Sequence, residues 1–183
     1  MSLAEALDRR RSVREFSEDR LSPEALSQLL WSAQGTTTAW GARTAPSAGA
    51  LYPLELYLVT PEGLWRYHPR EHDLRTVSQG DLRPALARAA LGQAAVEDAA
   101  AVVLVAGVFE RTSAKYGPRA ARYVMLEAGH VAQNVLLGAV ALDLAAVPVG
   151  AFDDERVRLA LDLRNGEEPL YLVAVGHPAV HRL

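Results

Sequence analysis

The chain has 183 residues, of which 50% are hydrophobic and 22% are charged, and its formal net charge is -3. This balance is typical of a globular protein with one core of ordinary size, and it gives no indication of nucleic-acid binding. The sequence contains no cysteine, which excludes disulfides, cysteine-ligated zinc, iron–sulfur clusters and thiol nucleophiles. We expect one domain, residues 1–183.

The sequence gives no sign of a membrane partner. The N-terminal segment carries acidic residues early and lacks the apolar stretch of a signal peptide. The most apolar stretch, Val131–Leu142, contains Gln133 and Asn134 and is too short to cross a bilayer. We therefore expect a cytoplasmic protein.

Two helices and a long loop are predicted for the first 51 residues. The first helix is expected over Leu3–Arg9. Ser22-Pro23-Glu24 supplies a capping hydroxyl, a first-turn proline and an acid, so a second helix should start there and end near Gly35. Thr36–Leu51 follows as a loop, and loops of this length in a compact domain are often functional.

The remaining elements alternate between strands and helices. Apolar or alternating runs predict strands at Leu54–Thr60, Leu64–Tyr67, Leu74–Val77, Val102–Val105 and Leu170–Val175. Helices are expected at Asp81–Leu91, Pro118–Leu142 and Asp153–Leu161. The long helix is apolar almost all round in its second half, which predicts burial on every side, in the core or against a second subunit. The order lacks a regular βαβ alternation, so the fold class is α+β with a mostly antiparallel sheet flanked by helices.

Common catalytic motifs are missing from the sequence. No two glycines have the G-x-G spacing of a dinucleotide-binding turn, and there is no phosphate-binding GxxxxGK[ST] loop. Ser47 lies in Ala-Pro-Ser-Ala-Gly, which lacks the first glycine of a nucleophile elbow. His68 and His72 have a spacing found in metal sites, but they flank what is predicted as a hairpin tip, and a turn is the preferred interpretation.

Three segments nevertheless suggest a ligand site. The run Arg10-Arg11-Ser12-Val13-Arg14 can surround a phosphate with guanidinium forks and a hydroxyl, although such a run alone is more often a solvated surface. The small residues of Arg43–Pro53 allow the backbone to approach a flat ligand, or form an ordinary loop. Pro148–Asp153 contains Gly150 directly after the long helix, and alone it indicates a turn into the next helix.

Together and in this order, these segments resemble the nitroreductase superfamily of FMN enzymes, and most closely its azoline (thiazole/oxazole) oxidase branch, the SagB type. That branch has an RRSxR start, a PSAGALxP loop and a KYGxRAxRY…EAGHxxQN helix. The corresponding residues here are Arg10–Arg14, Pro46–Pro53, Lys115–Tyr123 and Glu127–Asn134. The likeness extends over Leu7–Pro178.

The resemblance implies FMN as the cofactor, held between the two chains of a homodimer. It places the arginine segment at the phosphate and ribityl side, Pro46–Gly49 over the isoalloxazine, and Val149–Ala151 near its reactive N5. The residues implied to bind FMN are Arg10, Arg11, Ser12, Arg14, Pro46, Ser47, Ala48, Gly49, Leu51, Gln133, Pro148, Val149, Gly150, Ala151 and Arg182. Family members often continue past the final strand with basic residues at the phosphate, and here only His181 and Arg182 remain for that role.

The implied activity is hydride transfer through the flavin N5 in two half-reactions. The preferred substrates are NAD(P)H as donor and a nitroaromatic or quinone as acceptor. One alternative is dehydrogenation of an azoline of a peptide heterocycle, in which the pair Lys115 and Tyr116 would be catalytic; a solvated lysine beside a core tyrosine is about equally favoured. A flavin-binding protein without turnover is the other alternative.

Overall fold

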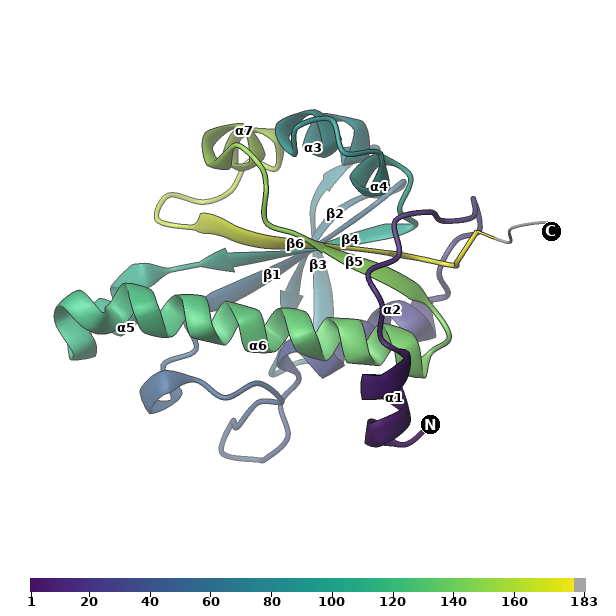
Figure 1. Ribbon diagram of the computed structural model, residues 1–183. Coiled ribbons are helices and arrows are strands. Elements are labelled where there is room, and N and C mark those ends of the chain that lie inside the picture. Colours follow the sequence, from purple (N-terminus) through teal and green to yellow (C-terminus); the bar gives the residue numbers. More distant parts are fainter. Residues whose placement is uncertain (180–183) are drawn as a thin grey trace.

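The structure, a computed structural model, describes residues 1–179. Its centre is one six-stranded sheet with the order β3-β2-β1-β4-β6-β5, in which every neighbouring pair is antiparallel (Figure 1). The strands are β1 (Leu54–Thr60), β2 (Gly63–His68), β3 (Asp73–Gln79), β4 (Ala101–Gly107), β5 (Ala145–Val149) and β6 (Glu168–Gly176). The predicted α+β class and antiparallel sheet are confirmed.

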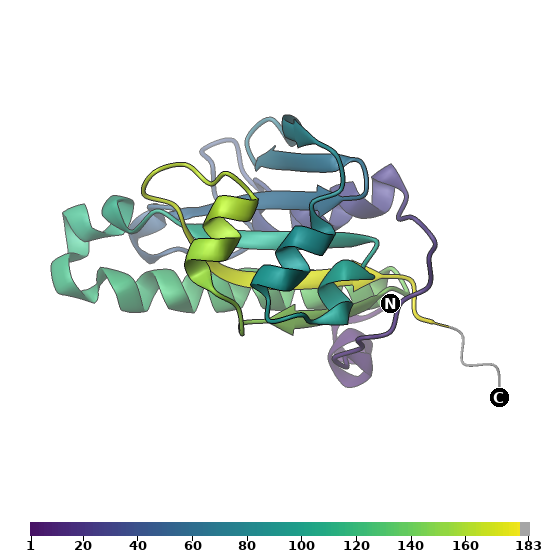
Figure 2. The ribbon, with the colours of Figure 1, turned by 90° about the horizontal axis from the view of Figure 1, so that it is seen from above.

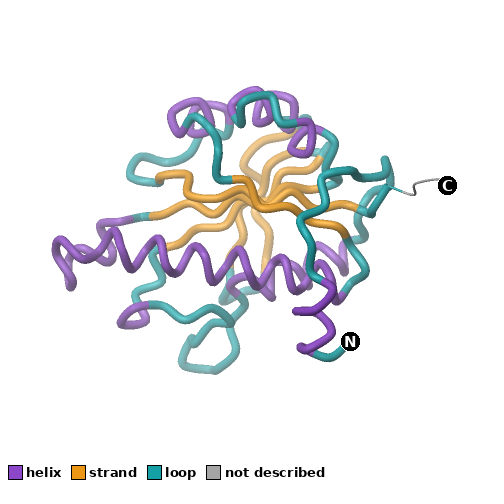
Figure 3. Tube along the Cα trace, in the orientation of Figure 1, coloured by secondary structure: helices purple, strands orange, loops and turns teal. Residues whose placement is uncertain are grey.

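Helices cover both faces of the sheet. The α-helices are α1 (Leu3–Arg9), α2 (Pro23–Gln34), α3 (Arg83–Ala89), α4 (Ala94–Glu97), α5 (Phe109–Tyr116), α6 (Ala120–Ala141) and α7 (Asp154–Ala160), with short 3₁₀ turns η1 (Ala48–Ala50) and η2 (Gly117–Arg119). Helices α2 and α6 lie on one face, and α3, α4 and α7 lie on the other (Figures 1 and 2). The long loop between α2 and β1 lies beyond α6, away from the sheet (Figure 3).

The core therefore has two halves that meet at the central strand β4. Val103 and Val105 face the α2–α6 side, whereas Val102 and Leu104 face the α3–α7 side. All seven residues of β4 are buried, which confirms the expected strand with two covered faces. The hairpin of β2 and β3 is also confirmed, with its tip between them.

Strand β5 and the short helices α4 and α5 were not predicted. Strand β5 lies between the long helix and Gly150, so the interpretation of Pro148–Asp153 as a turn directly after that helix is wrong. Proline usually argues against a strand, but β5 pairs only with β6 at the edge of the sheet, where a missing N–H is tolerated. Helix α5 was missed because its eight residues are mostly polar, and Pro118 lies in η2 rather than in α6.

The long helix is half exposed in the single chain. Val124, Val131 and Val135 are fully buried, whereas Met125 and Leu126 are each 55% exposed. The expectation of burial on every side within this chain is wrong, because the sheet can cover only one face of a helix. From Phe109 to Ala141, α5 and α6 are long and apolar enough for a membrane span by length and composition alone, but the buried face packs on the sheet.

Candidate functional site

The arginine segment crosses the start of β5. The N–H of Val13 donates to the carbonyl of Ala146 at 3.0 Å, which fixes the segment beside the sheet edge. Arg11, Ser12 and Arg14 are exposed and Arg10 is half-buried. Within residues 1–179, none of these three arginines forms an ion pair, so the segment carries three cations without a carboxylate partner, although Arg11 Nη1 donates to the carbonyls of Asp8 and Arg10.

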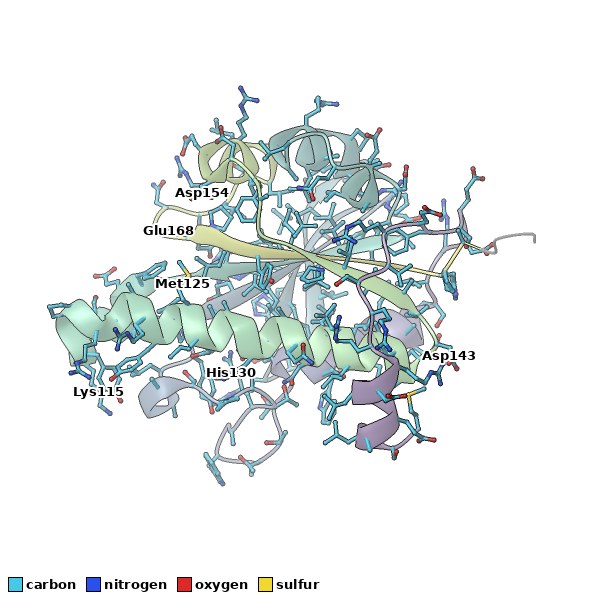
Figure 4. The ribbon with its side chains drawn as sticks, viewed as in Figure 1. Lys115, Met125, His130, Asp143, Asp154 and Glu168 are labelled. Atoms are coloured by element: carbon cyan, nitrogen blue, oxygen red, sulfur yellow. The ribbon has the colours of Figure 1, made fainter. Side chains whose placement is uncertain are left out.

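The neighbouring Arg9 behaves differently. Its Nη2 donates to the carboxylate of Asp143 at 2.9 Å, and Asp143 stands just after the end of α6 (Figure 4). Asp143 adopts the left-handed conformation, with φ +56°, which glycine adopts more readily than other residues. The ion pair thus links α1 to the residue after α6. It also explains why an aspartate stands at a position whose backbone favours glycine.

The segment after β5 is open on one side. Val149 is buried, whereas Gly150 and Ala151 are exposed. A Cβ built on Gly150 would meet only the ring of Tyr171, at 3.6 Å and beyond. Backbone at this end of β5 is accessible to a flat ligand, as the sequence predicts, and Asp153 then caps α7 by accepting from the N–H of Arg156 at 2.9 Å.

The loop that contains Pro46, Ser47 and Ala48 lies against the exposed side of α6. An open cavity of about 270 Å³ separates the two, and its other walls are Tyr123, Leu126, Glu127 and His130. His130 lies on the side of α6 that faces this loop (Figure 4). The loop and the first half of α6 therefore form one continuous surface.

Lys115 and Tyr116 meet this loop at Gly49. A Cβ added to Gly49 would lie 2.8 Å from Tyr116 Oη and 2.9 Å from Lys115 Nζ. Gly49 also has φ +64°, a backbone conformation that favours glycine, whereas the close contacts are to the mobile ends of two side chains that could shift. The ring of Tyr116 packs edge-on against Tyr123, with centroids 4.9 Å apart. The structure thus brings the amine, the phenol and the loop together.

Lys115 is the only lysine in a chain that has 19 lysines and arginines. Everywhere else the chain uses arginine, which stays protonated in proteins, whereas a lysine amine can lose its proton. In the single chain the side chain of Lys115 is exposed, with its amine beside Gly49. The catalytic role and the solvated surface role of Lys115 both stay predictions.

The parts of the predicted site do not converge within one chain. The arginine segment lies by the end of α6, where Arg11 shares a cavity with Val140, whereas the Pro46–Ala48 loop lies opposite His130. His130 and Val140 are ten helical residues apart, about 15 Å. Gln133 is half-buried on α6 between them. Leu51 is half-buried after η1, and Arg182 lies outside the described residues.

A buried polar cluster beneath the loop was not predicted. Glu127 on α6 is 2% exposed and Gln34 on α2 is fully buried; Gln34 Nε2 donates to Glu127 Oε1 at 3.4 Å. Arg43 Nη1 donates to Gln34 Oε1 at 2.9 Å, and Glu127 is also hydrogen-bonded to the hydroxyl of Ser47. A glutamate within an otherwise apolar helical face was the available signal, since such a residue needs buried partners.

Burial raises the pKa of Glu127, against the opposing effect of its hydrogen bonds with Ser47 and Gln34 and of the charge on Arg43. A carboxyl whose pKa is raised on folding stabilises the fold most below its unfolded pKa and loses that contribution as pH rises through the folded pKa. We therefore expect Glu127→Gln to gain stability relative to the parent as pH rises above the ordinary pKa of a glutamate. Urea unfolding at several pH values measures this, with exposed Glu97→Gln as control; a pH-independent difference for Glu127→Gln would contradict it.

Comparison with known proteins identifies the family. The model of the nitroreductase family matches residues 7–177. A candidate nitroreductase of Methanocaldococcus jannaschii is 42% identical over 182 residues, which span 96% of this chain and 91% of that protein. The crystal structure of a candidate nitroreductase from Ralstonia eutropha JMP134 has a TM-score of 0.90 at 30% identity, and the match covers 99% of this chain and 85% of the other.

The fold is also shared with more distant proteins. A chain of the Escherichia coli microcin synthetase McbBCD complex has a TM-score of 0.81 at 23% identity, with 98% of this chain and 74% of that chain covered. At this identity the likeness shows the fold alone. The family model and the archaeal relative cover nearly the full length, so the resemblance seen in the sequence is confirmed: the chain belongs to the nitroreductase family of oxidoreductases.

Proposed function

We propose that the chain is an FMN-dependent oxidoreductase that works as a homodimer. Proteins of the nitroreductase family generally bind flavin and are typically dimeric. The main support for the proposal is that the two parts of the predicted site, the arginine segment and the Pro46–Gly49 loop, lie apart along the exposed face of α6. An unpaired arginine segment stands near one end of this face, and the Pro46–Gly49 loop stands near the other.

A twofold pairing of α6 explains this division. In an antiparallel pair centred near Gln133, His130 of one chain would lie roughly opposite Leu136 or Leu137 of the other. Such a pairing would bring each loop toward the arginine segment of the partner subunit, and it would cover the exposed Met125 and Leu126. An apolar face of this kind is typical of obligate interfaces.

The residues present fit FMN. Arg10, Arg11, Ser12 and Arg14 would hold the phosphate end, because they offer a hydroxyl and three cations that form no ion pair within the described residues. The open backbone at Val149–Ala151, after Pro148, would face the ring on one side. The residues proposed to complete the site from the loop and α6 are Pro46, Ser47, Ala48, Gly49, Leu51 and Gln133. When bound, FMN takes up a hydride at N5 from one substrate and passes it to a second.

We propose NAD(P)H as the donor and a nitroaromatic or quinone as the acceptor. The chain's own contribution is to orient the reactants, exclude water and tune the ring with nearby cations. The Lys115–Tyr116 pair at Gly49 favours a second candidate, dehydrogenation of an azoline-type ring. In that reaction the Lys115 amine would take a proton from the substrate, with Tyr116 Oη as its neighbouring hydrogen-bonding group.

The test is a visible spectrum of the purified protein, followed by anaerobic mixing with NADH or NADPH. We expect the absorption of a bound flavin that bleaches on mixing. A bound flavin that neither nucleotide reduces would favour the azoline reaction or a binding protein without turnover. A protein that stays colourless when mixed with FMN would reject the proposal.

Lys115→Ala separates the roles of this residue. If Lys115 moves a proton, turnover should fall by about 10²-fold or more while FMN remains bound. Lys115→Arg is the matched variant: it keeps a cation at Gly49 but cannot act as a base at neutral pH, so it should not restore turnover. Steady-state kinetics and the flavin spectrum measure both quantities. Full activity in Lys115→Ala would return the residue to a solvated surface role.

A further inference from the structure

The loop next to Lys115 and Tyr116 has an unfavourable backbone. Gly49, Ala50 and Tyr52 all have positive φ, at +64°, +53° and +46°. Glycine tolerates this conformation, whereas a non-glycine residue is destabilised in it by contact of its Cβ with the backbone. Ala50 and Tyr52 therefore need contacts outside the local sequence to keep the loop in this shape.

Such contacts form a closed ring around the loop. The guanidinium of Arg43 stacks on the ring of Tyr52, 4.4 Å from its centroid, and the N–H of Tyr52 donates to Ser47 Oγ at 2.9 Å. Ser47 is hydrogen-bonded to Glu127, Glu127 accepts from Gln34, and Gln34 accepts from Arg43. We call these five residues the contact ring.

The contact ring joins the start, middle and end of the loop to both helices beneath it. Arg43 precedes the loop, Ser47 lies within it and Tyr52 follows it, while Gln34 belongs to α2 and Glu127 to α6. Glu127 and Gln34 are buried, so their bonds are little weakened by competition with water. Glu127 of α6 is bonded to Ser47 in the middle of the loop, and Gln34 of α2 is bonded to Arg43 at its start.

We propose that Glu127 is a positioning residue: through Ser47 it holds the Pro46–Gly49 loop, and the left-handed residues at its end, in the shape that faces the flavin. That the bound group is FMN rests on the proposed function, whereas the holding of the loop does not. The carboxylate reaches the loop only through the Ser47 hydroxyl, so its removal should release the loop and leave the sheet intact.

Hydrogen exchange at the Tyr52 amide measures directly whether the loop keeps its shape, since the acceptor of this amide is Ser47 Oγ. Hydrogen exchange measured by NMR on the full chain, without added flavin, compares this amide with that of Leu104 in the buried strand β4. Global destabilisation accelerates both amides, whereas release of the loop accelerates Tyr52 alone. We expect Ser47→Ala and Glu127→Ala to speed exchange at Tyr52 by about tenfold, with little change at Leu104.

Glu127→Gln is the matched control, because its amide can still bond to Ser47 and Gln34; exchange at Tyr52 should remain close to that of the parent. Unchanged exchange at Tyr52 in Glu127→Ala, or equal acceleration at Leu104, would overturn the positioning role. If Glu127→Ala fails to fold, Glu127→Met decides, since it keeps a helix-forming side chain of similar volume and removes both acceptor oxygens. Ser47→Ala removes the acceptor of the Tyr52 amide itself, so it serves as the reference for a released amide.

FMN titration of the same variants tests the link to the cofactor. Glu127→Ala should weaken FMN binding by about tenfold, and Glu127→Gln should restore it. Faster Tyr52 exchange with unchanged FMN affinity would overturn the flavin-facing role of the loop. If the parent itself binds no FMN, the proposed function fails, and the exchange rates still decide whether Glu127 holds the loop.

Discussion

Replacement of both Arg10 and Arg11 by alanine is expected to weaken FMN binding by about 10²–10⁴-fold. Each charge-assisted hydrogen bond to a phosphate contributes about 1.5–3 kcal/mol, and these side chains form no ion pair within the described chain that could compensate for the loss. Fluorescence titration of FMN measures the affinity. The loss should shrink as salt rises, because the contacts are exposed.

The neighbouring arginine supplies the control. Arg9→Ala removes the same charge from the same part of the chain, but Arg9 is bonded to Asp143 and should change FMN affinity little. Riboflavin, which lacks the phosphate, gives a second comparison: the double variant should bind it about as well as the parent does. An equal loss for FMN and riboflavin would show that Arg10 and Arg11 do not contact the phosphate.

Arg66→Met is expected to lower the free energy of unfolding by about 3–5 kcal/mol, because it leaves buried Glu167 without its cation and leaves Glu55 with only the partly exposed Arg111. Arg66 Nη2 lies 2.8 Å from Glu55 Oε2, and Nη1 lies 3.4 Å from Glu167 Oε1. All three side chains are at most 12% exposed. Tyr57 donates to Glu167 at 2.6 Å, and burial raises the pKa of that tyrosine, so it stays a neutral donor.

Arg111→Met is the matched variant for this test. Arg111 also pairs with Glu55, but its side chain is 41% exposed, and an exposed pair contributes about 1 kcal/mol or less. Urea unfolding at neutral pH measures both variants. Equal losses of unfolding free energy for Arg66→Met and Arg111→Met would mean that water reaches the Arg66 ion pairs and that their burial does not increase their contribution to stability.

The sequence was informative where local chemistry decides structure. Ser22 caps α2 by accepting from the N–H of Ala25, and Asp153 caps α7, as predicted from residue type alone. The apolar run at Val102–Val105 indicated the central strand, because a strand that is buried on both faces has no polar positions. The order of the motifs was sufficient to indicate the family.

Residue type alone was not sufficient where the structure depends on contacts between residues distant in the sequence. Pro148 argued against a strand, but the edge position of β5 removes the need for its N–H. Glu127 gave no prediction of its role, because Gln34 and Ser47, its bonding partners, are far from it in sequence. Long-range polar pairs of this kind leave no periodic pattern along the chain.

The sequence by itself was enough to predict three features: the arginine segment, the Pro46–Gly49 loop and the apolar long helix. Each depends on residue types within a short stretch of the chain. Only the tertiary structure decided their relation. It places Lys115 and Tyr116 against Gly49, and it sets the loop and the arginine segment near opposite ends of the exposed face of α6. The reason is geometric: the sheet covers only one face of α6, so the other face is exposed and available to a ligand or a second subunit.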